Sequence, residues 1–258
     1  MLTTDQVDHF RTFGFTVLCG YLADRTSALR AEADAAIRDA YAATYHERVI
    51  DGISGHYLPM ASRLTPVSAS LVCDEPRFAD AAEQLLGGPV IPECPEGVLY
   101  FAEAGWQTDD GIGVRGVKFA AYFEQLTAAT GALRLVPGSH HPGQNARLAA
   151  YSKRRGRATD DAGFAAYQAR FPGYLAATSP GDVIAFDLHT WHASSGGRTG
   201  WPGTRSTCMP RKRTTSGTAR CGPRTTASSR RTAASTPAAI RCGGTGSPAP
   251  PPVRAAAR

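Results

Sequence analysis

The first hydrophobic residues of the chain recur at roughly helical spacing over residues 2–13. This periodicity predicts an amphipathic helix, because residues three or four positions apart share one helix face. Thr3 or Thr4 is suited to cap its N-terminus, and Gly14 is suited to end it. The apolar run over residues 15–18 then predicts a short strand.

Two later segments also show helical periodicity. Residues 24–43 contain no glycine or proline, and apolar side chains recur every fourth position from Leu29 to Ile37. A shorter pattern predicts another helix over residues 76–87, ended by its glycine. Residues 44–66, between these two helices, show no clear period and are expected to be irregular.

The pattern changes to short apolar runs in the second part of the chain. Glycine and proline turn signals separate these runs, which predict strands over residues 98–102, 117–123, 132–136 and 182–186. A long insertion over residues 143–178 is basic and is expected to be partly helical. Helices followed by short strands predict a mainly β fold with flanking α-helices, built around an antiparallel jelly-roll barrel.

The composition is that of a globular protein. The 258 residues are 42% hydrophobic and 19% charged, which argues against a collagen-like chain, a coiled coil or wholesale disorder. No apolar run approaches the ~18 residues of a membrane span, and the N-terminus lacks the pattern of a signal peptide. Six scattered cysteines without a C-x-x-C pair argue against a zinc ribbon or a disulfide scaffold. We therefore expect a cytoplasmic protein.

The net charge of +6 is unevenly distributed. Residues 198–258 hold eleven arginines, one lysine and no acidic residue, which leaves 16 basic and 22 acidic residues and a net charge of −6 in residues 1–197. The C-terminal segment also has too few large apolar residues to offset the entropy of ordering it. The pattern therefore predicts a folded domain over 1–197 and a basic low-complexity tail over 198–258.

Three interpretations of this tail compete. It could be a basic arm that binds nucleic acid, a disordered extension without function, or a frameshift-derived segment. The third is favoured, because a GC-rich gene that is read out of frame yields strings of Arg, Thr, Pro, Ala, Gly and Ser. Back-translation with chosen codons and a shifted frame turns the start of the tail into an arginine followed by an apolar strand.

Four motifs resemble those of one enzyme family. They comprise the L-T-x-x-Q-x-x-x-F-x-x-x-G-F opening and residues 105–110, 130–140 and 181–194. Together they resemble the phytanoyl-CoA dioxygenase (PhyH) family over about residues 2–198. The resemblance implies a double-stranded β-helix, a cupin-like jelly roll. It also implies an Fe(II)-dependent hydroxylase that consumes O₂ and converts 2-oxoglutarate to succinate.

The metal ligands that this resemblance implies are incomplete. Iron oxygenases of this kind hold Fe(II) with two histidines and one carboxylate. Asp109 matches the carboxylate and His192 matches the second histidine, whereas Gln107 occupies the position of the first histidine. An amide oxygen binds Fe(II) more weakly than imidazole does, so we expect weaker metal binding and poor turnover. A sequence error, an engineered change and a natural divergence all remain open as origins of Gln107.

The anchor for 2-oxoglutarate is also displaced. In the family an arginine shortly after the second histidine binds the far carboxylate through its planar fork. Arg198 is the candidate at that point, and Arg205 lies in the same neighbourhood. The frame-shifted reading would instead place the arginine at Gly200. Arg115 and Lys118, next to the strand after Asp109, are the alternative anchors.

Other notable side chains have simpler expected roles. Barrel packing is expected for Trp106, Phe119 and Tyr122. Turn positions are expected for Asp110, His140 and His141, whereas His189 is expected on the strand face opposite to His192, at the surface or behind the ligands. His56 and Tyr57 could line the substrate entrance. The basic cluster from Lys153 to Arg157 is expected to be a solvated face, with a lid over an anionic substrate as the alternative.

The expected function is hydroxylation of a small molecule in natural-product (antibiotic) biosynthesis, by an enzyme that uses Fe(II), 2-oxoglutarate and O₂. The GC-rich signature, which is typical of actinobacterial genomes, favours that substrate class over an acyl-CoA. One alternative is a non-catalytic small-molecule-binding protein of the same fold, in which Gln107 has abolished metal binding. The other is a nucleic-acid-binding protein with a basic tail, which is disfavoured. The oligomeric state stays open.

Overall fold

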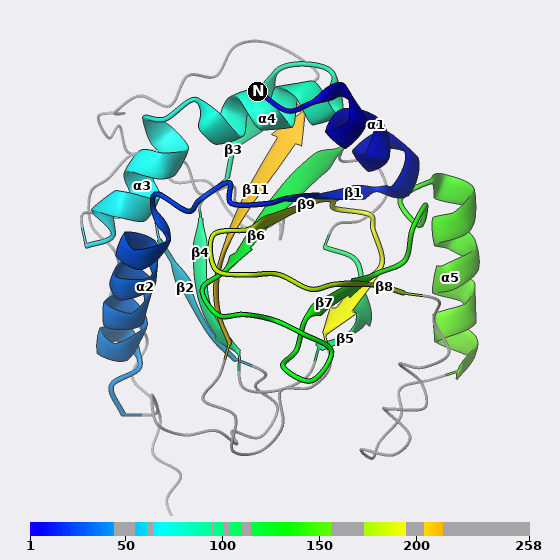
Figure 1. The fold of residues 1–258 in the computed structure, drawn as a ribbon. Helices are drawn as coiled ribbons and strands as arrows, with labels where there is room; N and C mark the ends of the chain where they lie inside the picture. Colours follow the sequence, from blue (N-terminus) through cyan, green and yellow to red (C-terminus); the bar gives the residue numbers. More distant parts are fainter. Residues whose placement is uncertain are drawn as a thin grey trace, which may run out of the picture.

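The computed structural model describes eight stretches of the chain. These are residues 1–43, 55–60, 64–93, 95–100, 104–109, 115–155, 173–194 and 204–213. Figure 1 shows how they form two sheets with helices around them. Among the described residues, no helix is both long enough and apolar enough to cross a membrane.

The N-terminal elements follow the sequence pattern closely. Helix α1 (Thr4–Phe13) begins with a capping box, in which Thr3 Oγ1 accepts from the Gln6 N–H and Gln6 Oε1 accepts from the Thr3 N–H. It ends at Gly14, whose φ of 84° is left-handed. Strand β1 (Phe15–Leu18) follows at once and pairs with β9. The first two predicted elements are confirmed.

The larger sheet is antiparallel throughout. Its strands lie in the order β1, β9, β6, β11, β4 and β2, and β3 also pairs with β11. The further strands of this sheet are β2 (Gly55–Pro59), β3 (Val90–Pro92), β4 (Glu96–Tyr100), β6 (Gly116–Tyr122), β9 (Val183–Asp187) and β11 (Thr204–Arg213).

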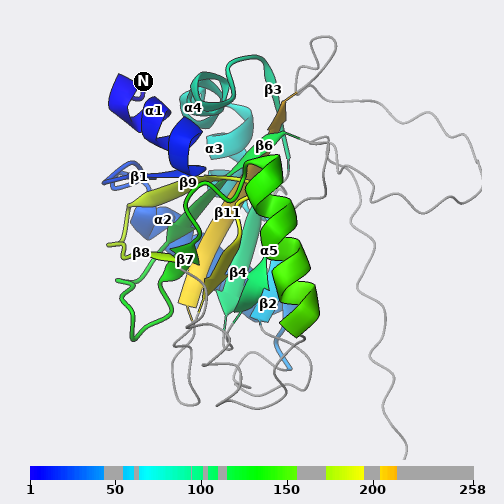
Figure 2. The same cartoon turned by 90° about the vertical axis from the view of Figure 1, so that its right-hand side faces the viewer.

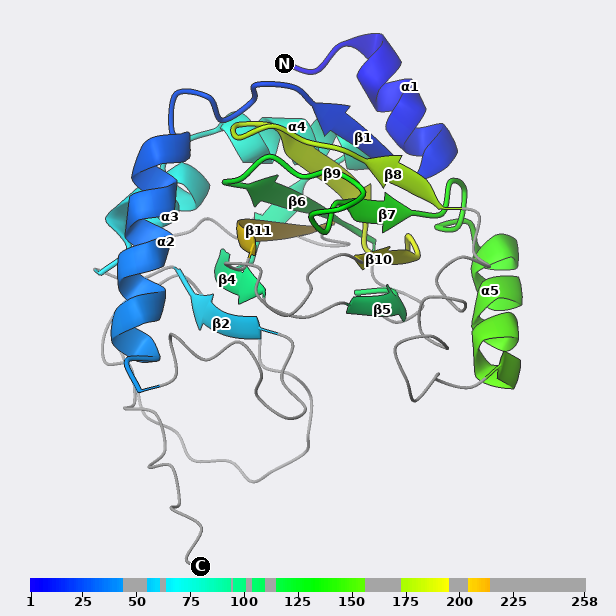
Figure 3. The ribbon, with the colours of Figure 1, turned by 60° about the horizontal axis from the view of Figure 1, so that its bottom comes forward.

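A smaller antiparallel sheet lies opposite. Its strand order is β5, β10, β7 and β8, and its strands lie beside those of the larger sheet, to the right in Figure 3. Its strands are β5 (Ala104–Gln107), β7 (Leu133–Leu135), β8 (Tyr174–Ala176) and β10 (His192–Ser194). This arrangement confirms the predicted double-stranded β-helix, or jelly roll.

Helices cover the outer face of the larger sheet. Three of them, α2 (Thr26–Ala40), α3 (Pro66–Cys73) and α4 (Arg77–Leu86), lie there with α1, whereas α5 (Pro142–Arg155) runs beside the smaller sheet (Figure 2). Phe78 of α4 packs edge-to-face on Phe119 of β6, with ring centroids 4.9 Å apart. The helices therefore enclose a core between themselves and the larger sheet.

Strand β6 separates this core from the space between the sheets. Val117, Phe119 and Ala121 belong to the core under the helices. Lys118 and Tyr122, which alternate with them, line a pocket on the opposite face. Because side chains alternate between the two faces of β6, Lys118 points into the interior of the barrel.

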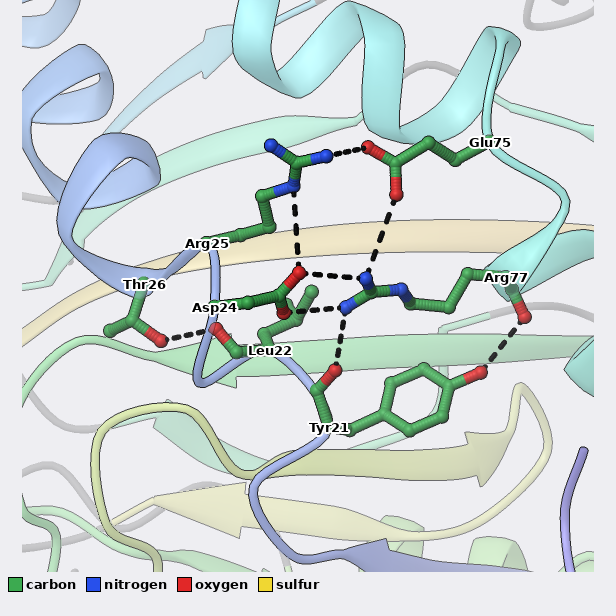
Figure 4. A network of polar contacts seen from close by, with 7 residues as sticks. All are labelled: Tyr21, Leu22, Asp24, Arg25, Thr26, Glu75 and Arg77. Carbon is green, nitrogen blue, oxygen red and sulfur yellow. Dashed lines mark hydrogen bonds and ion pairs between the residues drawn. The ribbon is translucent and has the colours of Figure 1, made fainter.

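An ionic network joins the loop before α2 to the start of α4 (Figure 4). Arg77 donates through two nitrogens to the two carboxylate oxygens of Asp24, each at 2.8 Å. Arg25 donates to Glu75 at 2.8 Å, and the Tyr21 hydroxyl donates to the Arg77 carbonyl, also at 2.8 Å. The guanidinium of Arg77 therefore bridges two segments that lie about fifty residues apart in the chain.

The short strands β3, β5, β8 and β10 have no counterpart among the predicted strands, and three further segments also differ from the sequence-based expectation. Residues 55–59, expected to be irregular, form β2 at the edge of the larger sheet. Helix α3 was not predicted, and its N-terminal N–H groups are capped by Glu32 of α2, which accepts from Val67 and Ser68 at 2.6 and 2.8 Å. Because this cap comes from another helix, local sequence carries no signal for it.

The third difference concerns the predicted tail over 198–258. Ten of its residues form β11, which lies between β6 and β4 in the larger sheet. The folded part of the chain therefore extends beyond the predicted boundary at residue 197. The remaining residues of the tail lie outside the described part of the chain, as do residues 44–54 and 156–172.

Candidate active site

His192 begins strand β10 and lies almost entirely buried, with 8% of its side chain exposed. Its Nδ1 lies 2.9 Å from the Thr190 carbonyl oxygen. A carbonyl can only accept, so Nδ1 donates to it, which leaves Nε2 as the nitrogen that faces Asp109. That Nε2 lies 3.5 Å from Asp109 Oδ1. The histidine is thereby oriented as metal-binding histidines usually are, with its other nitrogen donating to a carbonyl.

Asp109 follows strand β5 and is held by backbone and side-chain contacts. Its N–H donates to the Leu188 carbonyl at 2.9 Å, and Lys118 Nζ lies 3.1 Å from its Oδ2. Burial alone would raise the pKa of Asp109, but its contact with His192 and the charge of Lys118 outweigh burial and hold the pKa well below its ordinary value. The carboxylate is therefore ionised at neutral pH.

Gln107 faces the same site from the neighbouring strand. In the pairing of β5 with β10, the Cα atoms of Gln107 and His192 are direct partners. Gln107, Asp109 and His192 all line one pocket. The structure thus brings the three predicted ligand positions together, although they lie up to 85 positions apart in the sequence.

The loop between β9 and β10 is fixed on both sides of His192. The Trp191 N–H donates to the buried Ser139 Oγ at 2.9 Å, and Thr190 Oγ1 donates to the Gly14 carbonyl at 3.0 Å. Sequence reasoning missed Ser139 and Thr190, because their partners lie 52 and 176 positions away. Only the P-G-S-H turn motif around Ser139 could have drawn attention to it.

His189 does not line the pocket that contains Asp109 and His192. It lies in the turn between β9 and β10, rather than on a strand as predicted. Its backbone N–H and its Nδ1 both contact Asp187 Oδ1, each at 2.9 Å. His189 lines a different cavity from the one that Asp109 and His192 line.

The pocket at the site has a volume of about 150 Å³. Tyrosines form much of its wall, namely Tyr57, Tyr100 and Tyr122. Tyr57 is therefore at the pocket, as the sequence suggested, but His56 is buried and stacks on Tyr41 with ring centroids 4.3 Å apart. Trp106 and Phe119 are buried packing residues, as expected.

The candidate anchors for 2-oxoglutarate have different positions. Lys118 lines the pocket, whereas Arg115 lines a separate cavity of about 440 Å³ beside α1 and the start of α5. Arg115 is therefore not at the pocket that contains Asp109 and His192, contrary to expectation, because the two cavities share no lining residue. Arg198 and Gly200 lie outside the described residues.

His140 and His141 line this separate cavity as well, at the turn before α5. They are thus at a turn, as predicted, and do not line the pocket that contains Asp109 and His192. Burial, followed by the charge of His141, lowers the pKa of His140. Asp110 and most of the basic cluster after Lys153 lie outside the part of the structure that can be described.

Strand β11 presents no arginine at the positions that are paired with the pocket wall. Ser206, Cys208 and Pro210 are in register with Tyr122, Ala120 and Lys118, respectively, whereas Arg205 is in register with the buried Leu99. Among the described residues that line the pocket, Lys118 is therefore the one lysine or arginine.

The donor set fits a divalent cation. A carboxylate oxygen and an imidazole nitrogen 3.5 Å apart can both reach one ion, and both are ligands that Fe(II) accepts. Gln107 adds a neutral amide at the third position. No group of three or more His, Cys, Asp or Glu side chains suited to a metal occurs in the described residues, because that third position holds glutamine.

The sequence profile of the phytanoyl-CoA dioxygenase (PhyH) family matches residues 10–205. No functionally curated protein matches the chain. AviO1 from Streptomyces viridochromogenes Tue57 is similar in structure, with a TM-score of 0.60, 21% identity and coverage of 85% of this chain and 100% of AviO1.

Two further solved structures show the same fold. HygX from Streptomyces hygroscopicus, solved with nickel and 2-oxoglutarate bound, has a TM-score of 0.64 and 16% identity over 83% of this chain and 88% of HygX. SnoN, a non-heme alpha-ketoglutarate-dependent epimerase from nogalamycin biosynthesis, has a TM-score of 0.55 and 18% identity, with coverage of 80% of this chain and 81% of its own. At these identities the likeness establishes the fold alone.

Proposed function

Because this chain belongs to the phytanoyl-CoA dioxygenase family, we propose that it is an Fe(II)- and 2-oxoglutarate-dependent hydroxylase of a small molecule. Asp109 and His192 hold the metal, and Gln107 takes the third protein position. The proposal rests above all on one observation. Nε2 of His192 lies 3.5 Å from Asp109 Oδ1, and its ring is fixed by the Thr190 carbonyl.

Bound iron and 2-oxoglutarate would supply the activation of O₂ and the oxidation of a substrate C–H bond. The residues of the chain prepare the site for both. The Thr190 carbonyl fixes the ring of His192. The hydrogen bond from the Asp109 N–H to the Leu188 carbonyl holds the backbone of Asp109 just after the end of β5. Lys118 offers an ammonium inside the pocket and is the proposed anchor for the distal carboxylate of 2-oxoglutarate. Arg198 remains a second candidate for that role.

The proposed substrate is a natural product, with antibiotic biosynthesis as the setting. SnoN belongs to nogalamycin biosynthesis, and the GC-rich signature of the sequence points the same way. Three tyrosines around the pocket offer flat apolar faces together with hydroxyl donors. Such a wall suits a compact organic molecule that carries polar groups.

The direct test is turnover of 2-oxoglutarate by the full chain under limiting Fe(II). The proposed function predicts succinate formation and O₂ consumption that are lost in Asp109→Ala and His192→Ala. It also predicts an increase in Gln107→His, because imidazole binds Fe(II) better than an amide does. Absence of succinate from both the wild type and Gln107→His would refute the proposal.

Gln107 itself favours a second candidate, a non-catalytic binding protein of the same fold. In that case the wild type binds small molecules in the pocket but binds neither Fe(II) nor 2-oxoglutarate at micromolar concentrations. Metal binding that appears only in Gln107→His would support this alternative for the chain as it stands.

The basic segment can be tested separately for nucleic-acid binding. A functional arm would give DNA binding that weakens steeply with salt and is lost when the arm is removed. Because β11 (Thr204–Arg213) is part of the larger sheet, the truncation should begin after Arg213 and not at residue 197. Unchanged DNA binding after that truncation would rule out an arm.

A further inference from the structure

We infer that the cavity beside α1 and the start of α5 is a second binding site, which takes a small organic anion and acts on Asp109 and His192 through the turn between β9 and β10. The anionic group is a carboxylate or a phosphate, because both offer the oxygen acceptors that arginine binds in pairs. The proposed function does not use this cavity, so the inference stands or falls independently of it.

The cavity lies where α5 begins beside the C-terminal end of α1 (Figure 1). Two contacts hold the turn before α5 against this helix. His140 Nε2 lies 3.2 Å from the Arg11 carbonyl oxygen, and the Gly138 N–H donates to the Phe13 carbonyl at 2.8 Å. The cavity has a volume of about 440 Å³, which falls within the roughly 300–1,000 Å³ of small-molecule sites.

The charged side chains of this cavity favour an anion. Arg11 and Arg115 both line it, and Asp187 is the one acidic group among the described residues that do so. Asp187 already has a partner, because its Oδ1 accepts from the His189 N–H and lies 2.9 Å from His189 Nδ1. With the histidines neutral, two arginines and one aspartate leave a net charge of +1.

Both arginines retain donors for a ligand. Arg11 uses one nitrogen, Nη2, to donate to the Gln84 carbonyl at 3.1 Å. Within the described part of the chain, no ion pair involves Arg115. Each guanidinium carries five N–H donors in a planar fork, which matches the spacing of carboxylate and phosphate oxygens. The two side chains can therefore bind an anion without giving up the contacts that they make now.

Apolar side chains complete the wall of the cavity. Phe10 of α1, Leu85 of α4 and Pro142 at the start of α5 all line it. An apolar wall with a few charged groups is typical of a site for an organic molecule. The carbon body of such a ligand would cover these three side chains and gain from the burial of apolar surface. The ligand is therefore an organic anion rather than an inorganic ion.

The turn between β9 and β10 forms another part of the wall. Asp187 and His189, at the two sides of Leu188, both line the cavity. Asn145 of α5 lines it as well and donates through Nδ2 to the His189 carbonyl at 2.8 Å. A ligand in the cavity therefore contacts the same turn that α5 holds in place.

This turn also carries the contacts that fix both proposed metal ligands. The Leu188 carbonyl accepts from the Asp109 N–H at 2.9 Å. The Thr190 carbonyl lies 2.9 Å from His192 Nδ1. A ligand that restricts the turn therefore orders Asp109 and His192, although it touches neither of them.

The binding test is calorimetric titration of the full chain at neutral pH with three probes of similar shape. They are 2-naphthoate, 2-naphthyl phosphate and the neutral 2-naphthamide. The better of the two anions should bind at least about tenfold more tightly than the amide, because hydrogen bonds to charged groups are the stronger ones. The tighter anion identifies the anionic group that the cavity prefers.

Variants locate the bound anion. Arg115→Gln should raise the Kd of the preferred anion about fivefold, the upper range for an exposed ion pair. Arg11→Gln combined with Arg115→Gln should raise it at least about tenfold. Arg147→Gln, at an exposed arginine of α5 that does not line the cavity, is the matched control and should behave as the wild type. Circular dichroism spectra that match the wild type confirm that each variant is folded.

Amide hydrogen exchange tests the action on the pocket that contains Asp109 and His192. With the preferred anion at ten times its Kd, amides that open only after the ligand leaves should exchange about tenfold more slowly. We expect this protection over residues 187–192 and also over residues 107–109, which the ligand does not contact. In the double arginine variant, the same concentration of the anion should give little protection in either segment.

The possible results separate the two parts of the inference. The second site is refuted if neither anion binds better than the amide, or if the double variant keeps the wild-type Kd. It is equally refuted if anion binding is lost in Lys118→Met instead, because the anion then occupies the other pocket. Binding that depends on the two arginines without protection of residues 107–109 supports the site and refutes its action on Asp109. None of these results changes the succinate assay, which tests the proposed function by itself.

Discussion

Gln107 and His192 lie directly opposite each other on the paired strands β5 and β10. A cross-strand pair on one sheet face has Cβ atoms roughly 5 Å apart. A side chain at position 107 can therefore reach the same metal ion as His192. Substituting an imidazole there needs no change in the backbone of either strand.

The Gln107→His variant should therefore bind Mn(II) or Fe(II) at least about tenfold more tightly than the wild type, since even indirect partners of metal ligands change affinity by about that factor. Metal affinity from calorimetry is the measurement. Gln84→His, on helix α4 and outside the lining of the pocket, provides the matched control and should leave the affinity unchanged. An equal effect of both substitutions would mean that position 107 does not reach the metal.

Ser139→Ala should destabilise the fold through the loop that carries His192. Ser139 is fully buried and its Oγ accepts from the Trp191 N–H at 2.9 Å. Removal of the hydroxyl leaves a buried N–H without its partner, which costs about 1–3 kcal/mol. Urea denaturation should show this loss, together with weaker Mn(II) binding. Ser27→Ala, at an exposed helical position, should stay within about 0.5 kcal/mol of the wild type.

Gly14→Ala should be more disruptive than an ordinary glycine substitution. Its φ is +84°, and an added Cβ would lie 2.5 Å from His140 Nδ1 and 2.6 Å from Thr190 Oγ1. Strain from the backbone and the clash together should cost at least about 2 kcal/mol and displace Thr190.

The matched comparison is Gly20→Ala, where φ is +65° but no atom lies within 4 Å of the added Cβ. That variant carries only the backbone penalty of about 1–2 kcal/mol. Thermal unfolding should therefore rank the wild type above Gly20→Ala and Gly20→Ala above Gly14→Ala. Metal affinity should fall in Gly14→Ala alone. Equal stabilities of the two variants would count against a tight approach at Gly14.

The Asp24–Arg77 ion pair predicts a specific acid sensitivity (Figure 4). Its hydrogen bond to Arg77 lowers the pKa of Asp24 to about 2, against an ordinary 3.8. A carboxyl with a lowered pKa in the folded state stabilises the protein above the ordinary value and loses this contribution as pH falls towards 2. Because the Asp24 side chain is 53% exposed, the contribution should be only about 0.5–1 kcal/mol.

Asp24→Asn should accordingly lower stability at neutral pH and flatten the decline between about pH 4 and pH 2. Urea unfolding at several pH values measures both effects. Asp5→Asn, near the N-terminus of α1 and without an arginine partner among the described residues, is the comparison for a carboxyl outside this network. A decline in Asp24→Asn as steep as in the wild type would contradict the proposed origin of the acid sensitivity.

The sequence by itself determined the local elements. The residues that define α1, from the capping threonine to Gly14, all lie within 12 positions, and the buried positions Leu29, Ala33 and Ile37 of α2 repeat within one helix. Such signals are complete within a short window, so they survive without tertiary information. The motif resemblance likewise singled out Asp109 and His192, which lie together in one pocket.

Only the tertiary structure decided how the site is assembled. Strands β5 and β10 contain four and three residues, too few to show a period, and their pairing sets Gln107 against His192 across 85 positions. The same holds for Lys118, whose partner Asp109 is chosen by the alternation of β6 and the path of the chain after β5. Strand pairing brings these side chains together only when long loops close. A local sequence pattern does not show which distant segments will pair.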